Sequence, residues 1–376
     1  MSAAPANAPS PNAPVTDERL RATPFISQVM ARPELGAVSG TVLVFLFFAL
    51  TAGSSGMFSA EGVMNWTVVS AQLGIIAIGA ALLMIAGEFD LSIGSMIGFA
   101  GMMIAIPTQF WNWPIEASVL FAFAGALAIG GLNGYLVVRT GLPSFIVSLA
   151  FLFILRGLTI ALAVLFTNRT IIGGVKNHST GSFVEWLFAG KIFQGAFIWF
   201  ADIGLLGKYP DGSPLVTGLP MVVVWWVLLA AVGSWILLRT KWGNWVFAVG
   251  GDANAARNMG VPVKRVKIAL FMVSALCATI YASCQVMEFG SAAADRGVLK
   301  EFEAIIAAVI GGVLLTGGYG TVIGPCFGAI IFGVVQMGIF YTGVNTDWFR
   351  VFLGVMLLLA VIFNTYVRTK VTGGRK

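Results

Sequence analysis

The sequence is poor in charged residues, and this shortage excludes most soluble folds. Charged residues make up 10% of the chain, hydrophobic residues make up 58%, and the mean hydropathy is +0.91. A soluble domain carries roughly 25% charged residues, which cover its surface in water. A chain this apolar is therefore expected to lie in a lipid bilayer.

Residues suited to metal binding and nucleophilic catalysis are also scarce. The only histidine is His178, and the cysteines Cys277, Cys284 and Cys326 form no Cys-x-x-Cys pair. A zinc site or a Ser-His-Asp triad needs a richer set of side chains, and a disulfide framework needs regularly spaced cysteines. These three kinds of site are therefore disfavoured, and we expect no metal in this chain.

The first residues are rich in Pro, Ala, Ser and Asn, which is typical of a disordered segment. They contain no basic region followed by an apolar one, so they do not resemble a cleaved signal peptide. We expect residues 1–35 to form a disordered cytoplasmic tail and residues 36–376 to form a single transmembrane domain.

Apolar runs bounded by charge, proline or glycine predict an all-α membrane protein of about ten spanning helices. One run, 303–316, is too short to cross a bilayer of about 30 Å as a straight helix, so a broken or re-entrant helix is expected there. The predicted spans are 38–56, 66–86, 91–106, 116–138, 144–166, 220–238, 268–287, 303–316, 321–340 and 346–364.

The distribution of basic residues predicts the orientation of the chain. The net charge is +6, and the connection 239–267 and the segment after residue 364 are both rich in Lys and Arg. Basic loops face the cytoplasm. Counting spans then places both termini and the 239–267 connection in the cytoplasm.

A weak internal repeat supports this arrangement. A shift of 230 positions places Ile75 on Ile305 and Gly87 on Gly317. Weak repeats are common in transporters, although chance matching among Gly- and Ile-rich segments is the alternative. The predicted parallel halves, each of four segments, are about 38–140 and 268–370, and the fifth and sixth spans join them.

Two acids, Glu88 and Asp90, follow Gly87 between apolar segments. Carboxylates near the membrane are costly and usually have a function or a partner. Glycine-interrupted segments at matching places in two halves indicate a broken helix that lines a pathway. The favoured interpretation of Asp90 is that it caps a helix starting at Leu91, which is compatible with a pathway role.

Two further polar residues lie within predicted spans. Arg156 is near the middle of the fifth span and needs a cavity or a polar partner, for which Glu88 and Asp90 are candidates. A functional role and a purely structural pair both remain open. For Asn133, an interhelical hydrogen bond is the favoured interpretation. The candidate pathway residues are therefore Glu88, Asp90, Asn133 and Arg156.

Two connections stand out. The 239–267 connection contains an Ala-rich helical piece that Gly260 would end. It is therefore either a small surface helix that a motor protein could bind or an ordinary basic loop.

The long stretch 167–219 mixes aromatic and polar residues. This composition suits a segment in the membrane interface, or a solvent loop with an aromatic anchor.

Taken together, four stretches resemble permease subunits of bacterial ABC importers for monosaccharides, of the ribose/xylose/fructose type. The family pattern usually reads Gly-Gly-Ile-Asp where this chain has Gly87-Glu88-Phe89-Asp90. The stretches are GEFDLSIGS (87–95), LPSFIVSLAFLFILRGLT (142–159), GNWVFAVGGDANAARNMGV (243–261) and EAIIAAVIGGVLLTGGYGTVIGPCFGAII (303–331).

The resemblance implies a permease homodimer in the bacterial inner membrane, an ATP-binding cassette subunit and a periplasmic sugar-binding protein. It assigns no catalysis to this chain and implies no nucleic acid partner. The sequence contains no G-x-x-x-x-G-K-[ST], the phosphate-binding loop, so ATP is expected on the partner and no cofactor on this chain. The implied ATPase-coupling residues are Gly243, Asn244, Gly250, Gly251, Ala255, Ala256 and Gly260.

Two other functions stay open. An ion-coupled secondary transporter could use Glu88, Asp90 and Arg156 to relay protons or bind a coupling ion. A membrane enzyme would need a cluster of nucleophilic or metal-binding side chains, and the single histidine and scattered acids argue weakly against it.

Overall fold

The computed structural model describes residues 34–345, 347–356, 358–359 and 362 of the chain. The predicted tail 1–35 lies outside these residues, except that Glu34 begins a helix. The end of the predicted span 346–364 also lies outside them.

Long apolar helices make up most of the described chain. Seven of them, α3, α4, α5, α6, α10, α13 and α15, are long and apolar enough to cross a membrane. This confirms the all-α membrane class, whereas the prediction of about ten crossings is not confirmed. The long helices are α2 (Glu34–Ala52), α3 (Ala60–Ile85), α4 (Ile93–Phe110), α5 (Ile115–Thr140), α6 (Ser144–Thr167), α10 (Met221–Arg239), α13 (Val263–Phe289) and α15 (Ile323–Tyr341).

Helix α14 (Lys300–Ile310) has 11 residues. At 1.5 Å per residue it extends about 16 Å, roughly half of a bilayer core. This length fits the short, broken helix expected in the run 303–316.

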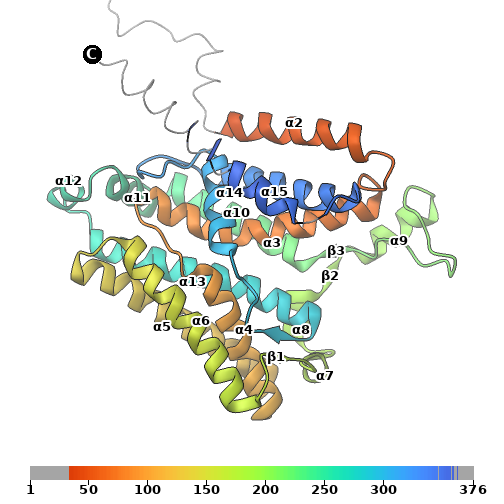
Figure 1. The fold of residues 1–376 in the computed structure, drawn as a ribbon, viewed down its shortest axis with the longest axis horizontal. Coiled ribbons are helices and arrows are strands. Elements are labelled where there is room, and N and C mark those ends of the chain that lie inside the picture. Colours follow the sequence, from red (N-terminus) through yellow and green to blue (C-terminus); the bar gives the residue numbers. More distant parts are fainter. Residues whose placement is uncertain (1–33, 346, 357, 360–361, 363–376) are drawn as a thin grey trace, which may run out of the picture.

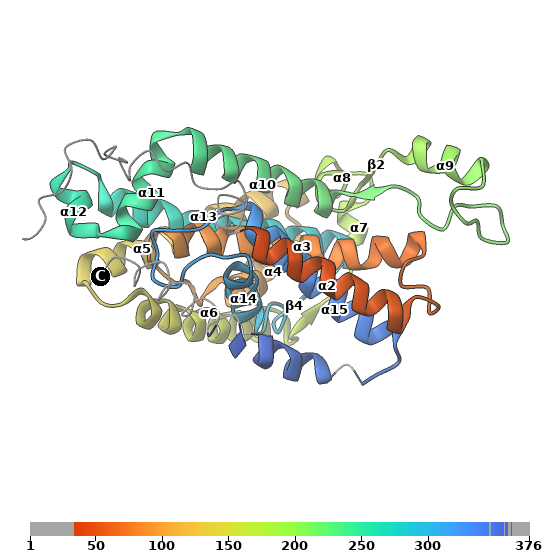
Figure 2. The ribbon, with the colours of Figure 1, turned by 90° about the horizontal axis from the view of Figure 1, so that it is seen from above.

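Shorter elements gather at the two ends of the helix bundle. Figures 1 and 2 show α11 and α12 at one end, and α8, α9 and β2 at the other. Strand β1 pairs antiparallel with β4, and β2 pairs with β3. The short elements are β1 (Ile171–Ile172), α7 (Lys176–Ser179), α8 (Phe183–Ala189), β2 (Lys191–Ile192), α9 (Gln194–Asp202), β3 (Leu219–Pro220), α11 (Lys241–Gly251), α12 (Ala253–Asn258) and β4 (Ala292–Ala293).

Prolines mark where several long helices begin. Pro114, Pro143, Pro220 and Pro262 occupy the position directly before α5, α6, α10 and α13. Proline lacks the N–H that a first helical turn would leave unpaired, and its fixed φ suits this place.

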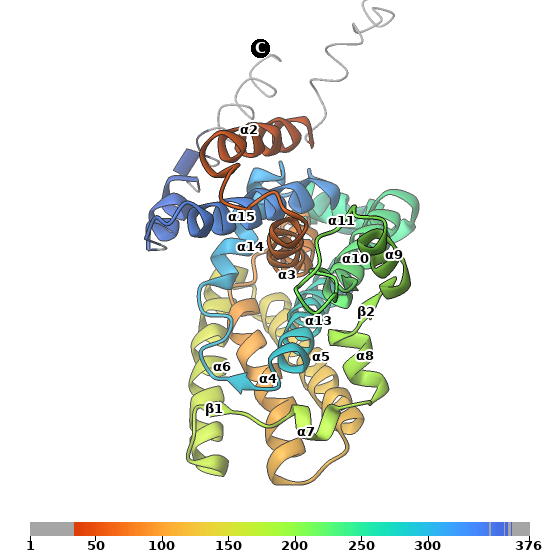
Figure 3. The same ribbon diagram turned by 90° about the vertical axis from the view of Figure 1, so that its right-hand side faces the viewer.

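Helix α3 forms the centre of the fold. Its residues 73–85 are all buried, and α13, α15, α10 and α14 pack around it. Figure 3 shows α3 nearly end-on, with α2 and α15 on one side and α4, α5 and α6 on the other. On α5, a side chain at Gly134 would come within 2.8 Å of the Ile268 backbone on α13. Small residues of this kind let membrane helices approach closely.

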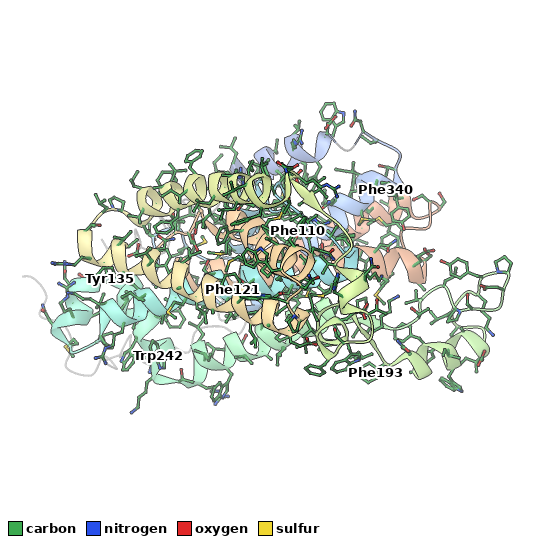
Figure 4. The ribbon with its side chains drawn as sticks, turned by 90° about the horizontal axis from the view of Figure 1, so that it is seen from below. Phe110, Phe121, Tyr135, Phe193, Trp242 and Phe340 are labelled. Atoms are coloured by element: carbon green, nitrogen blue, oxygen red, sulfur yellow. The ribbon has the colours of Figure 1, made fainter. Side chains whose placement is uncertain are left out.

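Exposed aromatic side chains lie toward both ends of the bundle. Tyr135 and Trp242 are near the end that carries α11 and α12, and Phe193 and Phe340 are toward the opposite end (Figure 4). Aromatic belts of this kind are typical of the two membrane–water interfaces. The arrangement fits a bilayer that lies across the long helices.

Candidate functional site

Two breaks in the helical chain meet inside the fold. The first follows α3, where Gly87 takes a left-handed φ of +80°, and the second follows α14, where Gly317 has φ +79°. A Cβ on Gly317 would be 2.7 Å from the Cα of Gly87. The Gly318 N–H donates to the Ile85 carbonyl at 2.8 Å. Both the backbone angles and the close approach therefore favour glycine here.

The end of α11 packs directly onto both breaks. A Cβ on Gly250 would lie 1.8 Å from the Ile85 carbonyl oxygen and 2.5 Å from the Gly318 nitrogen, and a Cβ on Gly317 would lie 2.9 Å from the Gly250 oxygen. Three chain segments thus touch backbone to backbone. We call this contact the glycine junction; it consists of Gly87, Gly250, Gly251, Gly317 and Gly318.

A buried hydrogen-bond network fixes the first break. One carboxylate oxygen of Asp90 accepts from the Ser92 N–H at 2.9 Å and the Ser92 hydroxyl at 2.5 Å. The other oxygen accepts from the Ser274 hydroxyl of α13 at 2.6 Å. Asn133 of α5 donates to the Ser92 hydroxyl at 3.3 Å, so its predicted interhelical bond is confirmed. Asp90 thus ties the start of α4 to α13, and Ser92 adds α5.

The second acid at this break pairs with a lysine. Glu88 forms an ion pair with Lys267 near the start of α13, and its side chain is 9% exposed. The neighbouring Phe89 N–H donates to the Ser144 hydroxyl of α6 at 3.0 Å. Lys267 is separated from α12 by only a short connection. The ion pair therefore connects the first break to the part of α13 nearest α12.

Two sequence predictions for this region are wrong. Glu88 and Asp90 are not partners of Arg156, because Lys267 and two serines take their carboxylates. Asp90 also does not cap a helix starting at Leu91, since α4 starts after Ser92. Asp90 still accepts from a backbone amide directly before that helix.

Arg156 lies instead near Glu301 at the start of α14. The two charges interact electrostatically, but the Nη2 atom of Arg156 and the Oε2 atom of Glu301 are both buried without a hydrogen-bond partner. Glu301 is 1% exposed. Its Oε2 atom rests against Gly94 of α4, where a Cβ would lie 1.9 Å away.

The 239–267 connection is mostly helical. Gly243, Asn244, Gly250 and Gly251 all lie within α11, a helix that the sequence did not predict. Gly243 is buried, and a Cβ there would lie 1.9 Å from the Leu237 carbonyl oxygen of α10. Tight packing against α10 at one end and against the two breaks at the other explains Gly243 and Gly250, whereas a Cβ on Gly251 would meet nothing within 4 Å.

The predicted Ala-rich helix is confirmed as α12. Asp252 caps it by accepting from the amides of Asn254 and Ala255 at 2.8 and 3.0 Å, and these bonds hold the Asp252 pKa below its ordinary value. Gly260 follows its end with φ +83°. Ala255 is exposed and Ala256 is buried, so of the two alanines only Ala255 can contact another protein directly.

Several residues at these contacts were not singled out from the sequence. Lys267 counted only among the basic residues of the 239–267 connection, and Glu301 was not considered as a site residue. Ser274 gave no signal, because a serine in an apolar helix is common. Met259, which is 84% exposed beside α12, could have been noticed as an apolar residue among polar ones.

The 167–219 stretch contains β1, α7, α8, β2 and α9 and exposes several aromatic side chains, among them Phe183, Phe193 and Trp199. It lies at the opposite end of the bundle from α12 (Figure 2). The exposed rings agree with both earlier interpretations, the interface segment and the anchored loop.

Comparisons with known proteins are consistent with this arrangement. The family described as branched-chain amino acid transport system / permease component matches residues 62–361, which is more than half of the chain. No solved structure matches the chain.

Among curated proteins, this chain is similar to three named sugar permeases. The Xylose transport system permease protein of Escherichia coli K12 is 30% identical, with 86% of this chain and 89% of the relative covered. The Fructose import permease protein of Rhizobium meliloti is 30% identical, with 88% and 86% covered. The Ribose import permease protein of Escherichia coli K12 is 29% identical, with 85% and 90% covered.

Proposed function

Because this chain belongs to the branched-chain amino acid transport system / permease component family, we propose that it carries a monosaccharide across the bacterial inner membrane as part of an ATP-driven importer. As a permease subunit, it is a transport component rather than an enzyme. The sugar class is supported by the xylose, fructose and ribose permeases to which the chain is similar.

The proposed topology has ten crossings in two parallel four-segment halves, with both termini in the cytoplasm. The repeat shift of 230 places α4, residues 93–110, on residues 323–340, and α15 spans Ile323–Tyr341. The same shift relates Gly87 to Gly317, which have almost the same φ. Basic residues around α11 and α12 support a cytoplasmic location for that end.

The partners would be an ATP-binding cassette subunit, a periplasmic sugar-binding protein and a second copy of this chain. ATP would bind to the cassette subunit, and this chain would need no cofactor. Helix α12 would be the contact with the cassette subunit. Its exposed surface supports this role, and the residues that form it are Asn254, Ala255, Arg257, Asn258 and the adjoining Met259.

The observation that carries the proposal is the glycine junction. Helix α11 leads directly into α12, and its last residues Gly250 and Gly251 touch both breaks at once. A movement of α12 imposed by the ATPase would therefore reach both halves through rigid backbone contacts. The first break would be held in position by the hydrogen-bonded or paired side chains of Glu88, Asp90 and Asn133. Of the four candidate pathway residues, Arg156 would then be the one that could contact the sugar.

Reconstitution tests the proposal. Proteoliposomes containing this chain, its cassette subunit and the binding protein should accumulate labelled xylose, ribose or fructose when ATP is enclosed. They should not do so with a proton gradient alone. Uptake driven by the gradient without the cassette subunit would instead support the ion-coupled transporter.

A variant of α12 tests the cassette contact. Replacing exposed Ala255 by Glu should weaken co-purification of the cassette subunit while membrane insertion stays normal, because the new charge would occupy the contact surface. Asp202→Asn on the opposite end of the molecule is the matched control. Unchanged co-purification of the Ala255→Glu variant would contradict the assignment of α12.

A further inference from the structure

Two charged side chains, one on α6 and one on α14, each have a buried atom without a hydrogen-bond partner. The Nη2 atom of Arg156 and the Oε2 atom of Glu301 are both inaccessible and unpaired. Buried polar groups are almost always hydrogen-bonded, so each exception needs an explanation. An unpaired buried group costs about 1–3 kcal/mol, and more when it is charged, so this arrangement is costly.

The two atoms belong to one place. The Arg156 and Glu301 charges interact electrostatically, and α4 packs against both α6 and α14. Glu301 is seated on Gly94, at the first turn of α4 after the first break. The nearby acid Glu303 already pairs with Lys300. Arg156 and Glu301 therefore each keep an atom without a hydrogen-bond partner, whereas the carboxylate of Glu303 is occupied by Lys300.

The surroundings of Arg156 are unlike those of a residue that only stabilises the fold. It lies near the middle of α6 and is partly exposed, and Phe153 and Ile154 on the same helix are 66% and 52% exposed. A guanidinium at this depth must face a polar cavity, a path or a partner. In a bilayer these exposed apolar neighbours would face lipid, so the buried Nη2 atom is the part of Arg156 that is placed to meet a ligand.

The chemistry of the pair favours a ligand without net charge. A guanidinium offers several fixed N–H donors, and a carboxylate offers acceptors only. Together they carry no net charge, so an anion would be repelled by Glu301 and a cation by Arg156. A molecule with neighbouring hydroxyl groups, each able to donate and accept, satisfies both, and the sugar class of the proposed function favours it over a zwitterion.

We propose that Arg156 and Glu301 form a binding point for the hydroxyl groups of the sugar inside the membrane. The inference rests on the proposed function and adds to it the residues that contact the cargo. In the arrangement described here Glu301 is closed off against Gly94. Separation of α14 from the start of α4, which Gly94 allows because no side chain intervenes, would open Glu301 to the sugar.

The test compares single and double neutral variants in reconstituted complexes. Arg156→Gln and Glu301→Gln are each expected to raise the KM for the transported sugar by about tenfold, equivalent to about 1.4 kcal/mol of lost binding. The probe is whichever of xylose, ribose and fructose the wild-type complex accumulates. Thermal stability of the detergent-purified complex is measured alongside.

The double variant Arg156→Gln/Glu301→Gln separates binding from a structural ion pair. If the pair only stabilises the fold, the double variant recovers both stability and KM, which would overturn the inference. If it binds sugar, stability recovers and the KM stays raised. Asp202→Asn, which removes an exposed ion pair with Lys208, should leave the KM unchanged.

The outcomes also separate this inference from the proposed function. A wild-type complex that accumulates sugar, together with single variants of unchanged KM, contradicts only the binding point. A wild-type complex that accumulates none of the three sugars with ATP contradicts the proposed sugar class, and with it this binding point. The binding point is also contradicted if neither single variant assembles and the double variant has the KM of the wild-type complex.

Discussion

The two breaks that meet at the glycine junction are held in different ways. Side chains fix the first break, where Glu88 pairs with Lys267 and Asp90 binds Ser92 and Ser274. The second break, 317–321, contains no acid and reaches the first through the backbone bond from Gly318. Side-chain bonds therefore anchor the first break to α13, whereas the second break meets the first through close backbone contact. We expect the first break to be the fixed side during transport.

The strongest expected effect comes from Asp90→Ala. It leaves the Ser274 hydroxyl and the Ser92 groups without their acceptor, at about 1–3 kcal/mol for each buried group left unpaired. The free energy of unfolding should fall by several kcal/mol, measured by thermal melting in detergent.

Thr321→Ala is the matched change at the second break. Thr321 accepts from the Gly324 amide at 3.1 Å, so we expect a loss of about 1 kcal/mol, as for a helix cap. A loss as large as that of Asp90→Ala would contradict the difference between the breaks.

Adjacent glycines on α11 test the backbone contact. Gly250→Ala places a methyl group against Ile85 and Gly318, whereas the equivalent position at Gly251 is open. Overpacking costs about 1–3 kcal/mol, so ATP-driven uptake should fall by about tenfold in Gly250→Ala. Gly251→Ala should transport within about twofold of wild type, since alanine is also the better helix former. Equal uptake by the two variants would exclude a transmitting role for Gly250.

The ion pair at the first break is expected to have a moderate effect. Glu88→Lys or Lys267→Glu places like charges together and should destabilise the complex by about 1–2 kcal/mol, since Lys267 keeps some solvent contact. The swapped double variant should recover stability and uptake. Failure of the swap to rescue either property would show that the pair does not connect the break to α13.

The smallest effect is expected at Asp252, whose exposed carboxylate caps the short helix α12. Its carboxylate has a pKa below the ordinary value because the Ala255 and Asn254 amides bind the charged form. Its stabilisation of α12 is therefore present above about pH 4 and is lost as the pH falls through the folded-state pKa. Hydrogen-exchange protection of α12 should decrease at acidic pH in the wild type. Asp252→Ser, which retains a cap that does not titrate, should lose this pH dependence.

Much of the fold was predictable because hydrophobic length and proline placement act locally. The helices α3 to α6, α10, α13 and α15 fall near their predicted spans. Helix α11 was missed because its glycines, Gly243, Gly250 and Gly251, have low helix propensity, which packing against α10 and the breaks overrides.

The site was less predictable than the fold. Glu88, Asp90, Asn133 and Arg156 were identified because polar residues in apolar runs are conspicuous. Their partners were not, since Lys267, Ser274 and Glu301 lie far along the chain and single-sequence patterns do not report contacts over such separations.

The central claim is that the first break stays anchored to α13 during ATP-driven transport while the second break moves against it. A short, reducible bifunctional thiol reagent that bridges cysteines at Glu88→Cys and Lys267→Cys would hold the first break on α13, with the treated wild type controlling for Cys277, Cys284 and Cys326. We predict that the cross-linked complex takes up sugar at the rate of the reduced complex. Loss of uptake on quantitative cross-linking, restored by reduction, would contradict the account.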